Sequence, residues 1–335
     1  MGLPSLPEWS WIVIVVAAAF TQTIRNTAQR KLTGTVGTLP ATWVRFLYGL
    51  PFAAAAVIVL QLVGERDGPA HAWTLPVIHL PFLVWLTIGA VGQLLATAFM
   101  LASMRERNFV IGVAYSKTDV LQVALFGALF LGEIPGWAAG FGMLVATAGV
   151  ILVSWPRKGP DPHVGTTAAA QEGGSGCRRP VRAFLIGPAA IWGLASGAGF
   201  AFSAVGYRGA ALALLAHNPD LSPWAIGAWG VLLAQCLQSA LLGAWIAWRQ
   251  RAALAAVARA WRLSLLAGAM GALASLGWFT AFAMRAAADV RAIGLVEVVF
   301  SVLVSSRLLR ESLSFTEFIG LALVGVGLFT LLILG

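Results

Sequence analysis

Apolar residues in this chain are grouped in long runs that are separated by short polar segments. A helix needs about 20 apolar residues to cross the hydrocarbon core of a bilayer, and ten of the runs are close to that length. The runs cover residues 9–32, 41–63, 80–104, 109–132, 136–155, 183–207, 223–248, 263–286, 287–309 and 315–334. The pattern predicts an all-α polytopic membrane protein with ten transmembrane helices.

Composition agrees with this prediction. Of the 335 residues, 59% are hydrophobic and only 10% are charged. Soluble domains are about half apolar and about a quarter charged, so an ordinary soluble enzyme is excluded. The net charge of +9 does not indicate a nucleic-acid partner, because the basic residues lie almost entirely between the apolar runs, where they orient membrane helices.

One long polar stretch divides the chain. Residues 157–182 are rich in Gly, Pro, Ser and Thr, a composition that buries too little apolar surface to fold. We therefore expect a first five-helix repeat at 1–156, a flexible linker at 157–182 and a second five-helix repeat at 183–335.

The two halves match when the sequence is shifted by 178 residues. The shift places Arg30 on Arg208, Asp119 on Glu297, Glu133 on Glu311, Gly142 on Gly320 and Gly149 on Gly327. Because each half has an odd number of predicted helices, the second half must enter the membrane from the opposite side. The sequence therefore predicts two inverted repeats, a layout of transporters whose site lies near the midplane.

The loop charges predict an orientation. With the N-terminus outside, the cytoplasmic loops hold fifteen Lys and Arg residues, and the opposite loops hold four, which are Arg66, Arg208, Arg285 and Arg291. Short cytoplasmic loops carry an excess of basic residues. The count therefore favours both termini outside.

Asp119 and Glu297 are acids in the middle of predicted helices, each the eleventh residue of its run. That position is about 15 Å from the helix end. A carboxylate there costs about 2.5 to 3.5 kcal/mol on insertion scales, so it should face the bundle interior or water. We interpret both as candidate proton-binding or substrate-binding groups. The alternative is a structural polar contact between helices.

Other polar residues surround Asp119. Positions three and four residues away carry Tyr115, Ser116 and Gln122. One polar stripe on an apolar helix is typical of a wet cavity wall. Lys117 points to nearly the opposite side from Asp119, so we expect another partner, with Glu297 as a candidate. The alternative for Lys117 is snorkelling to the membrane surface.

Three further residues complete the candidate set. Arg25 lies deep in the first run, and we expect it to bind an anionic substrate group. Gln93 and Trp278 are candidates to line a cavity, against the alternative of helix packing. Arg45 is close to a helix start and is expected to snorkel.

Small residues predict close helix contacts. Gly142 and Gly149 are seven residues apart, as are Gly320 and Gly327, so each pair lies on one helix face. Small faces let helix backbones approach in lipid. We expect helix packing or a dimer seam, and either a monomer or a homodimer.

The motifs of common enzyme chemistry are absent from the sequence. It has no H-E-x-x-H motif, Walker A loop or zinc-spaced cysteine pair. We therefore expect no cofactor, metal or catalytic residues, and any uphill transport would use an ion or substrate gradient.

Short motifs carry a family resemblance. They are Leu131-Gly132-Glu133 before Gly142 and Gly149, Leu309-Arg310-Glu311 before Gly320 and Gly327, and Gly294-Leu295-Val296-Glu297. With the repeat layout, they make the chain resemble the drug/metabolite transporter superfamily, specifically its ten-helix members with two EamA-type repeats.

The resemblance implies a basket of ten helices with a central cavity. Such proteins move small metabolites, amino acids or drugs by alternating access, often with protons, and generally have cytoplasmic termini, against the loop count above. Many relatives have Pro where this chain has Val298, so the sequence gives no reason for the bend that the resemblance implies there. Arg310 also replaces the usual Gly.

The sequence thus predicts a secondary active transporter of the inner or plasma membrane. We expect an exporter of small metabolites or amino-acid-like compounds, with protons as the candidate coupling ion. Acids and bases in one cavity would suit a zwitterion. The alternatives are a passive channel or facilitator, and a membrane-embedded enzyme that acts on lipid-linked substrates.

Overall fold

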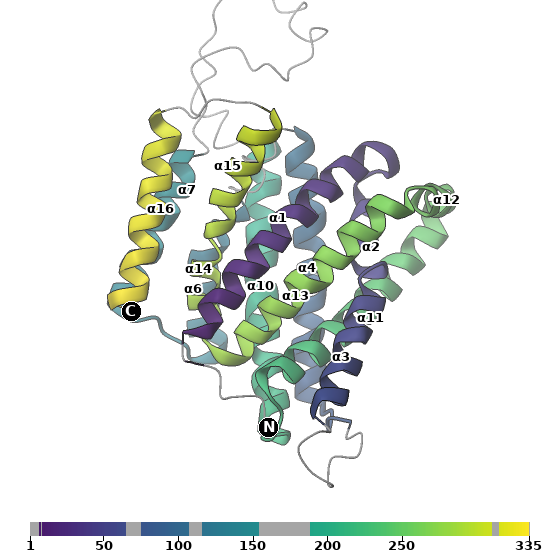
Figure 1. Ribbon diagram of the computed structural model, residues 1–335, viewed down its shortest axis with the longest axis horizontal. Coiled ribbons are helices and arrows are strands. Elements are labelled where there is room, and N and C mark those ends of the chain that lie inside the picture. The colour runs from purple at the N-terminus through teal and green to yellow at the C-terminus, as the bar shows by residue number, and fades with distance from the viewer. Residues whose placement is uncertain are drawn as a thin grey trace, which may run out of the picture.

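The computed structural model describes residues 7, 9–64, 75–106, 116–153, 188–309 and 315–334 (Figure 1). The helices of the first half are α1 (Ser10–Val36), α2 (Thr38–Leu47), α3 (Leu50–Gly64), α4 (Leu80–Glu106), α6 (Asp119–Leu131) and α7 (Trp137–Val153). Those of the second half are α10 (Pro188–His217), α11 (Pro223–Arg249), α12 (Arg251–Arg259), α13 (Trp261–Met284), α14 (Ala287–Ile293), α15 (Val296–Leu309) and α16 (Phe315–Leu334). The expected linker at 157–182 lies outside the described residues.

Seven stretches of the described chain are helices long and apolar enough to cross a membrane. They are Ser10–Val36, Thr38–Leu62, Leu80–Met104, Ile191–His217, Pro223–Arg249, Trp261–Met284 and Phe315–Ile333. Shorter apolar helices, α6 and α7, accompany them. The predicted class, an all-helical polytopic membrane protein, is confirmed.

Local residue chemistry sets several helix ends. The Ser222 side chain accepts a hydrogen bond from the Ala225 amide at 3.2 Å, directly before Pro223 at the start of α11. Both residue types are favoured at these positions. Gly132 ends α6 with a φ of 69°, a left-handed conformation that glycine adopts at little cost.

Two predicted spans are broken helices. The second span divides into α2 and α3 around Tyr48 and Gly49, and the ninth into α14 and α15 around Gly294 and Leu295. At the second break, a Cβ on Gly294 would collide with the Trp278 ring. The prediction of one continuous helix over 287–309 is therefore wrong. The interruption lies at Gly294 and Leu295, ahead of Val298, and occurs without a proline.

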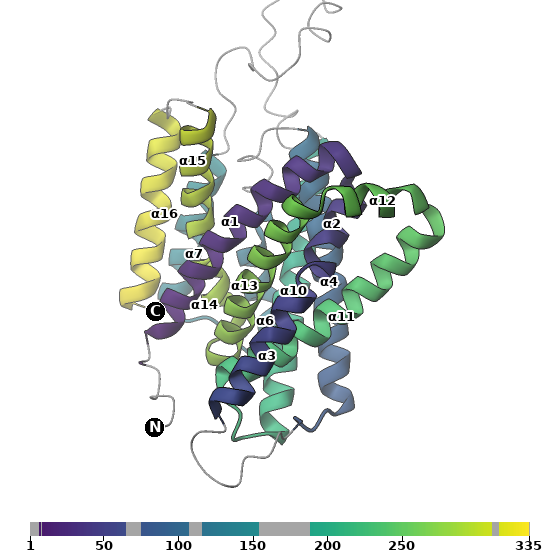
Figure 2. The same cartoon turned by 45° about the vertical axis from the view of Figure 1, so that its right-hand side comes forward.

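Other boundaries also differ from the sequence prediction. Helix α10 continues to His217 rather than ending at residue 207, so Arg208 lies inside a helix and not in a loop. The short helix α12, which the apolar runs did not predict, joins α11 to α13 at the edge of the bundle (Figure 2). Its only buried residue is Val257.

The principal packing contacts each join one helix of the first half to one of the second. Helix α1 packs on α13, α4 on α10, and α7 on α16 (Figures 1 and 2). The start of α1 and the end of α16 lie at the same end of the bundle. The two halves therefore share one core rather than forming separate bundles.

Glycines permit the closest of these contacts. A Cβ on Gly142 would lie 2.7 Å from the Gly327 carbonyl oxygen, and one on Gly149 would lie 2.6 Å from that of Gly320. Real Cβ atoms do not approach so closely. The glycine faces of α7 and α16 are thus occupied within one chain, and no dimer is needed to cover them.

Candidate functional site

Both intramembrane acids stand at the start of a helix. Asp119 is the first residue of α6, after a turn at Lys117 and Thr118, and Glu297 is the second residue of α15. The predictions that Asp119 and Glu297 each lie in the middle of a continuous helix are therefore wrong. Helix N-termini carry a partial positive charge that stabilises carboxylates.

Glu297 is 0% exposed, and both of its carboxylate oxygens have partners. Lys117 forms an ion pair with Oε2. Gln22 Nε2 donates to Oε2 at 2.6 Å, and Asn26 Nδ2 donates to Oε1 at 2.7 Å. The expected contact between Lys117 and Glu297 is confirmed, and the snorkelling alternative is wrong, because Lys117 is 3% exposed.

Asp119 is also 0% exposed and pairs with Arg291. Nε and Nη2 of Arg291 both donate to Oδ2, the first at 2.7 Å. The second oxygen, Oδ1, is buried and has no hydrogen-bond partner among the residues that the structure describes. The Arg291 guanidinium lies 4.9 Å from the Trp278 ring centre and 5.5 Å from that of Phe200.

The prediction that Arg291 lies in an outer loop is wrong, because it is buried within α14. Arg291 is six residues before Glu297 in the same apolar run. A charge at such a position needs a partner, and this signal was available in the sequence. The partner itself was not, because Asp119 is 172 residues away along the chain.

The two ion pairs cross between the halves. Lys117 of the first half pairs with Glu297 of the second, and Arg291 of the second half pairs with Asp119 of the first. The two acids are the residues that the 178-residue shift superimposes. Each equivalent acid is therefore neutralised by a base from the opposite half.

Arg25 is completely buried beside the Glu297 cluster. Its Nε and Nη2 donate to Asn26 Oδ1 at 3.1 and 2.5 Å, and its Nη1 donates to Gln22 Oε1 at 3.4 Å. Gln22 and Asn26 are therefore shared between Arg25 and the Glu297 carboxylate.

Arg45 is also buried, so the prediction that it snorkels is wrong. Nη1 donates to Thr97 Oγ1 at 2.8 Å and Nη2 donates to Ser275 Oγ at 3.4 Å. Within the described part of the chain, its Nε has no hydrogen-bond partner. The break after α2 lets this helix turn its Arg45 face to α4 and α13 instead of the membrane surface.

Trp278 connects the two ion pairs. Its Nε1 donates to Gln22 Oε1 at 2.9 Å, while Arg291 lies over its ring. The ring is buried and stacks on Phe282. Trp278 therefore fills the space between the Glu297 and Asp119 clusters.

Gln93 belongs to a neighbouring network. Its Oε1 accepts hydrogen bonds at 3.0 Å from both the Tyr207 hydroxyl and Gln238 Nε2. These contacts join α4, α10 and α11 one helical turn from Thr97, which contacts Arg45. Gln93 makes no direct contact with either acid.

Two residues of the expected polar stripe beside Asp119 lie in the described part of the chain, and both are at least partly covered. Ser116 is buried. Gln122 is partly buried, and its Nε2 lies 3.4 Å from the Cβ position of Gly197 on α10. Tyr115 lies outside the described residues.

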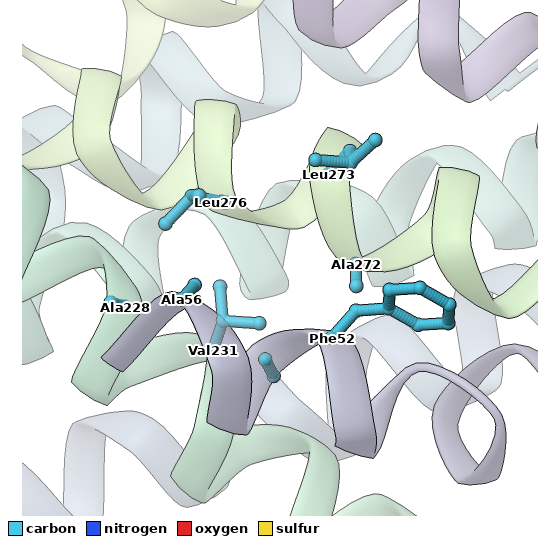
Figure 3. A pocket seen from close by; sticks show the side chains of 8 residues that line it. Phe52, Ala56, Ala228, Val231, Ala272, Leu273 and Leu276 are labelled. Atoms are coloured by element: carbon cyan, nitrogen blue, oxygen red, sulfur yellow. The ribbon is translucent and has the colours of Figure 1, made fainter. Parts of the chain in front are cut away.

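A small cavity lies away from these charges, between α3, α11 and α13 (Figure 3). Its lining is entirely apolar: Phe52, Ala53, Ala56, Ala228, Val231, Ala272, Leu273 and Leu276. The volume is about 30 Å³, too small for a metabolite. The two ion pairs are closed off from solvent in this conformation, since all four of their side chains are buried. No cluster of metal-ligating residues occurs in the described ranges.

A third ion pair joins the halves at one end of the bundle. Arg208 Nε donates to Glu133 Oε1 at 2.7 Å, and Arg208 Nη1 donates to the Phe282 carbonyl at 2.7 Å. Glu133 Oε2 accepts from the Ala287 amide at 3.3 Å, at the start of α14. The sequence shift marked Arg208 and Glu133 as repeat residues but did not predict this contact.

Comparisons with known proteins agree with this architecture. Residues 9–155 match the EamA-like transporter family. Among similar solved structures, one described only as "Crystal structure of protein" has a TM-score of 0.58 and 20% sequence identity, over 97% of this chain and 96% of that chain. At that identity, the likeness shows the fold alone. No curated protein matches the chain.

Proposed function

Since residues 9–155 match the EamA-like transporter family and the chain is a polytopic membrane protein, we propose that it is a secondary active transporter working by alternating access. Its substrates are small metabolites or amino-acid-like compounds, moved outwards across the inner or plasma membrane. The family match favours this function over an enzyme that acts on lipid-linked substrates.

Two sets of contacts support an inverted-repeat arrangement. The 178-residue shift converts the contact between Gly142 and Gly327 into the contact between Gly320 and Gly149. It likewise relates the packing of α1 on α13 to that of α10 on α4. A two-fold axis in the membrane plane accounts for both exchanges.

The crossed ion pairs are the observation that carries the mechanism. Each holds a base of one half against an acid of the other. Separating the halves at the centre would leave buried charges without partners, at a cost of several kcal/mol per ion. Opening is therefore favoured when water, a proton or the substrate replaces the lost partner.

Of the two acids, we take Asp119 as the candidate proton-binding group. Both oxygens of Glu297 are hydrogen-bonded, whereas Oδ1 of Asp119 has no partner. Protonation of Asp119 would weaken its attraction for Arg291 and so loosen one of the two central contacts. This step would couple a proton gradient to opening.

Counterflow in proteoliposomes tests the proposal. Vesicles loaded with a metabolite mixture are diluted into labelled compounds with and without a pH gradient, and uptake is measured by mass spectrometry. We expect exchange of at least one compound, with accumulation that follows the pH gradient and is lost in Asp119→Asn. Absence of exchange contradicts the transporter proposal. Exchange that ignores pH in wild type, Asp119→Asn and Glu297→Gln alike indicates a facilitator.

A further inference from the structure

Bases outnumber acids in the buried part of the described chain. Six ionisable side chains of the Asp, Glu, Lys and Arg types are buried there: Arg25, Arg45, Lys117, Arg291, Asp119 and Glu297. The crossed pairs use both acids and two of the four bases. Arg25 and Arg45 remain, and neither forms an ion pair with a described carboxylate.

The hydrogen-bond partners of these two arginines in the described chain are all neutral. Arg25 donates to the side-chain oxygens of Asn26 and Gln22, and Arg45 donates to two hydroxyls. Buried charges are normally paired with a charge of opposite sign, and ionisable residues within membrane spans generally mark substrate or ion pathways. The excess of positive charge therefore needs a functional reason.

The two side chains lie close together. A Cβ on Gly271 of α13 would be 3.1 Å from Cγ of Arg45 and 3.3 Å from Cδ of Arg25. The aliphatic parts of both arginine side chains therefore lie beside the same glycine. One helical turn further along α13, Ser275 contacts Arg45, and Thr97 of α4 contacts the same guanidinium. Two arginine side chains, and two hydroxyls that bind one of them, thus lie where α1, α2, α4 and α13 converge.

These hydrogen-bond donors suit a ligand with an oxyanion group. Guanidinium groups bind carboxylates and phosphates through paired, charge-assisted hydrogen bonds, and hydroxyls donate to the remaining oxygens. The Nε of Arg45 is buried without a partner, so this guanidinium retains an unused donor for a further acceptor.

We propose that the transported substrate is a small organic anion, whose carboxylate or phosphate group binds between Arg25 and Arg45 with Thr97 and Ser275. The inference rests on the proposed transporter function and narrows its substrate class. It replaces the zwitterion expected from the sequence, because Lys117 and Arg291 already neutralise both acids. In the closed conformation, the hydroxyls and amides hold the two arginines until the halves separate.

Matched compounds test the charge requirement. Counterflow is measured for succinate against succinamide, glycerol phosphate against glycerol, and glutamate against glutamine, with thermal stabilisation of the purified protein as an independent measure of binding. We expect exchange and stabilisation with at least one anion and neither with its uncharged or zwitterionic counterpart. The first two pairs distinguish a carboxylate ligand from a phosphate.

Variants test the site. Arg45→Gln and Arg25→Gln should each weaken the apparent affinity for the active anion by about tenfold or more, whereas Arg45→Lys should retain part of it. Arg249→Gln removes an exposed arginine at the end of α11 and should change nothing. Should Arg45→Gln fail to fold, Thr97→Val and Ser275→Ala leave both charges in place and should each weaken binding several-fold.

The outcomes separate the two proposals. Exchange of the neutral counterparts as fast as the anions, or anion affinity unchanged in both glutamine variants, overturns the anion inference and leaves the transporter proposal standing. Neither exchange nor stabilisation by any of the three anions also overturns the inference. The transporter proposal fails only if the wider metabolite mixture shows no counterflow.

Discussion

Each of the two buried acids in this protein forms an ion pair with a base that is far away in the sequence. Glu297 holds Lys117, and Asp119 holds Arg291, across sequence separations of 180 and 172 residues. Sequence reasoning identified both acids, because a carboxylate within an apolar run is conspicuous. It missed Arg291 and Arg45, because a basic residue near the end of an apolar run is equally compatible with a loop or with snorkelling.

The Lys117–Glu297 pair should show strong energetic coupling. Lys117→Met or Glu297→Gln alone leaves a buried charge without its partner, and we expect each to lower the free energy of unfolding by about 3 to 5 kcal/mol. The double variant removes both charges and should be more stable than the sum of the single effects implies.

Thermal or denaturant unfolding in detergent measures this coupling. Arg249→Met, which removes an exposed charge, serves as the control and should lie within about 0.5 kcal/mol of wild type. Additive losses in the double variant would show that the two side chains do not interact.

At the scale of the helices, apolar length predicted most of the spans and local packing decided where they break. The residues around Gly49 and Gly294 belong to continuous apolar runs, so hydropathy gave no sign of a break. The breaks depend on neighbours from other elements, since Gly49 faces Gln235 of α11 and Gly294 faces Trp278 of α13.

The crossing of α7 and α16 offers a matched pair of substitutions. Gly149→Ala places a methyl group 2.6 Å from the Gly320 carbonyl oxygen, whereas Gly140 on the same helix has no atom within 4 Å of its Cβ position. We expect Gly149→Ala to cost about 1 to 3 kcal/mol through overpacking.

Gly140→Ala should be neutral or slightly stabilising, because alanine is the better helix former. Unfolding in detergent compares the two variants. Equal stability would mean that α7 and α16 do not make this close contact in the membrane.

The Arg208–Glu133 pair should stabilise the conformation in which the two halves are in contact at this end of the bundle. Glu133→Gln weakens a charge-assisted hydrogen bond and the contact to the start of α14. Such bonds contribute about 1.5 to 3 kcal/mol, so the conformation open at this end should become about tenfold more populated.

This opening can be measured with a cysteine placed at Ala288, a buried residue of α14. The variant carries no other cysteine, because Cys177 and Cys236 are replaced. Its reaction with a membrane-impermeant thiol reagent should be about tenfold faster with Glu133→Gln. Asp220→Asn, an exposed acid between α10 and α11, is the control. Equal rates in the Glu133 variant and the control would show that the pair does not restrain α14.

At the scale of the whole molecule, the structure changes the charge count that sets orientation. Arg208 and Arg291 belong to helices α10 and α14 rather than to loops. Two of the four basic residues assigned to the outer side are thus removed. Eight of the fifteen assigned to the cytoplasmic side also lie in helices, so the excess of basic residues on the side of the linker is kept but does not increase.

We therefore predict that the linker faces the cytoplasm and that both termini face outwards. The chain has two cysteines, so Cys236→Ser leaves Cys177 in the linker as the only thiol. A membrane-impermeant maleimide should label Cys177 in inside-out vesicles and not in intact cells. The reverse labelling would instead support the cytoplasmic termini implied by the family resemblance.

The sequence by itself determined the membrane class, most of the spans and the two central acids. These follow from composition within windows of about 20 residues, where the cost of placing polar groups in lipid is a local property. Only the tertiary structure decided which base meets which acid, that Arg45 is buried, and where the helices break. Those features arise where segments from the two halves cross, and a linear pattern contains no distance between residues such as Asp119 and Arg291.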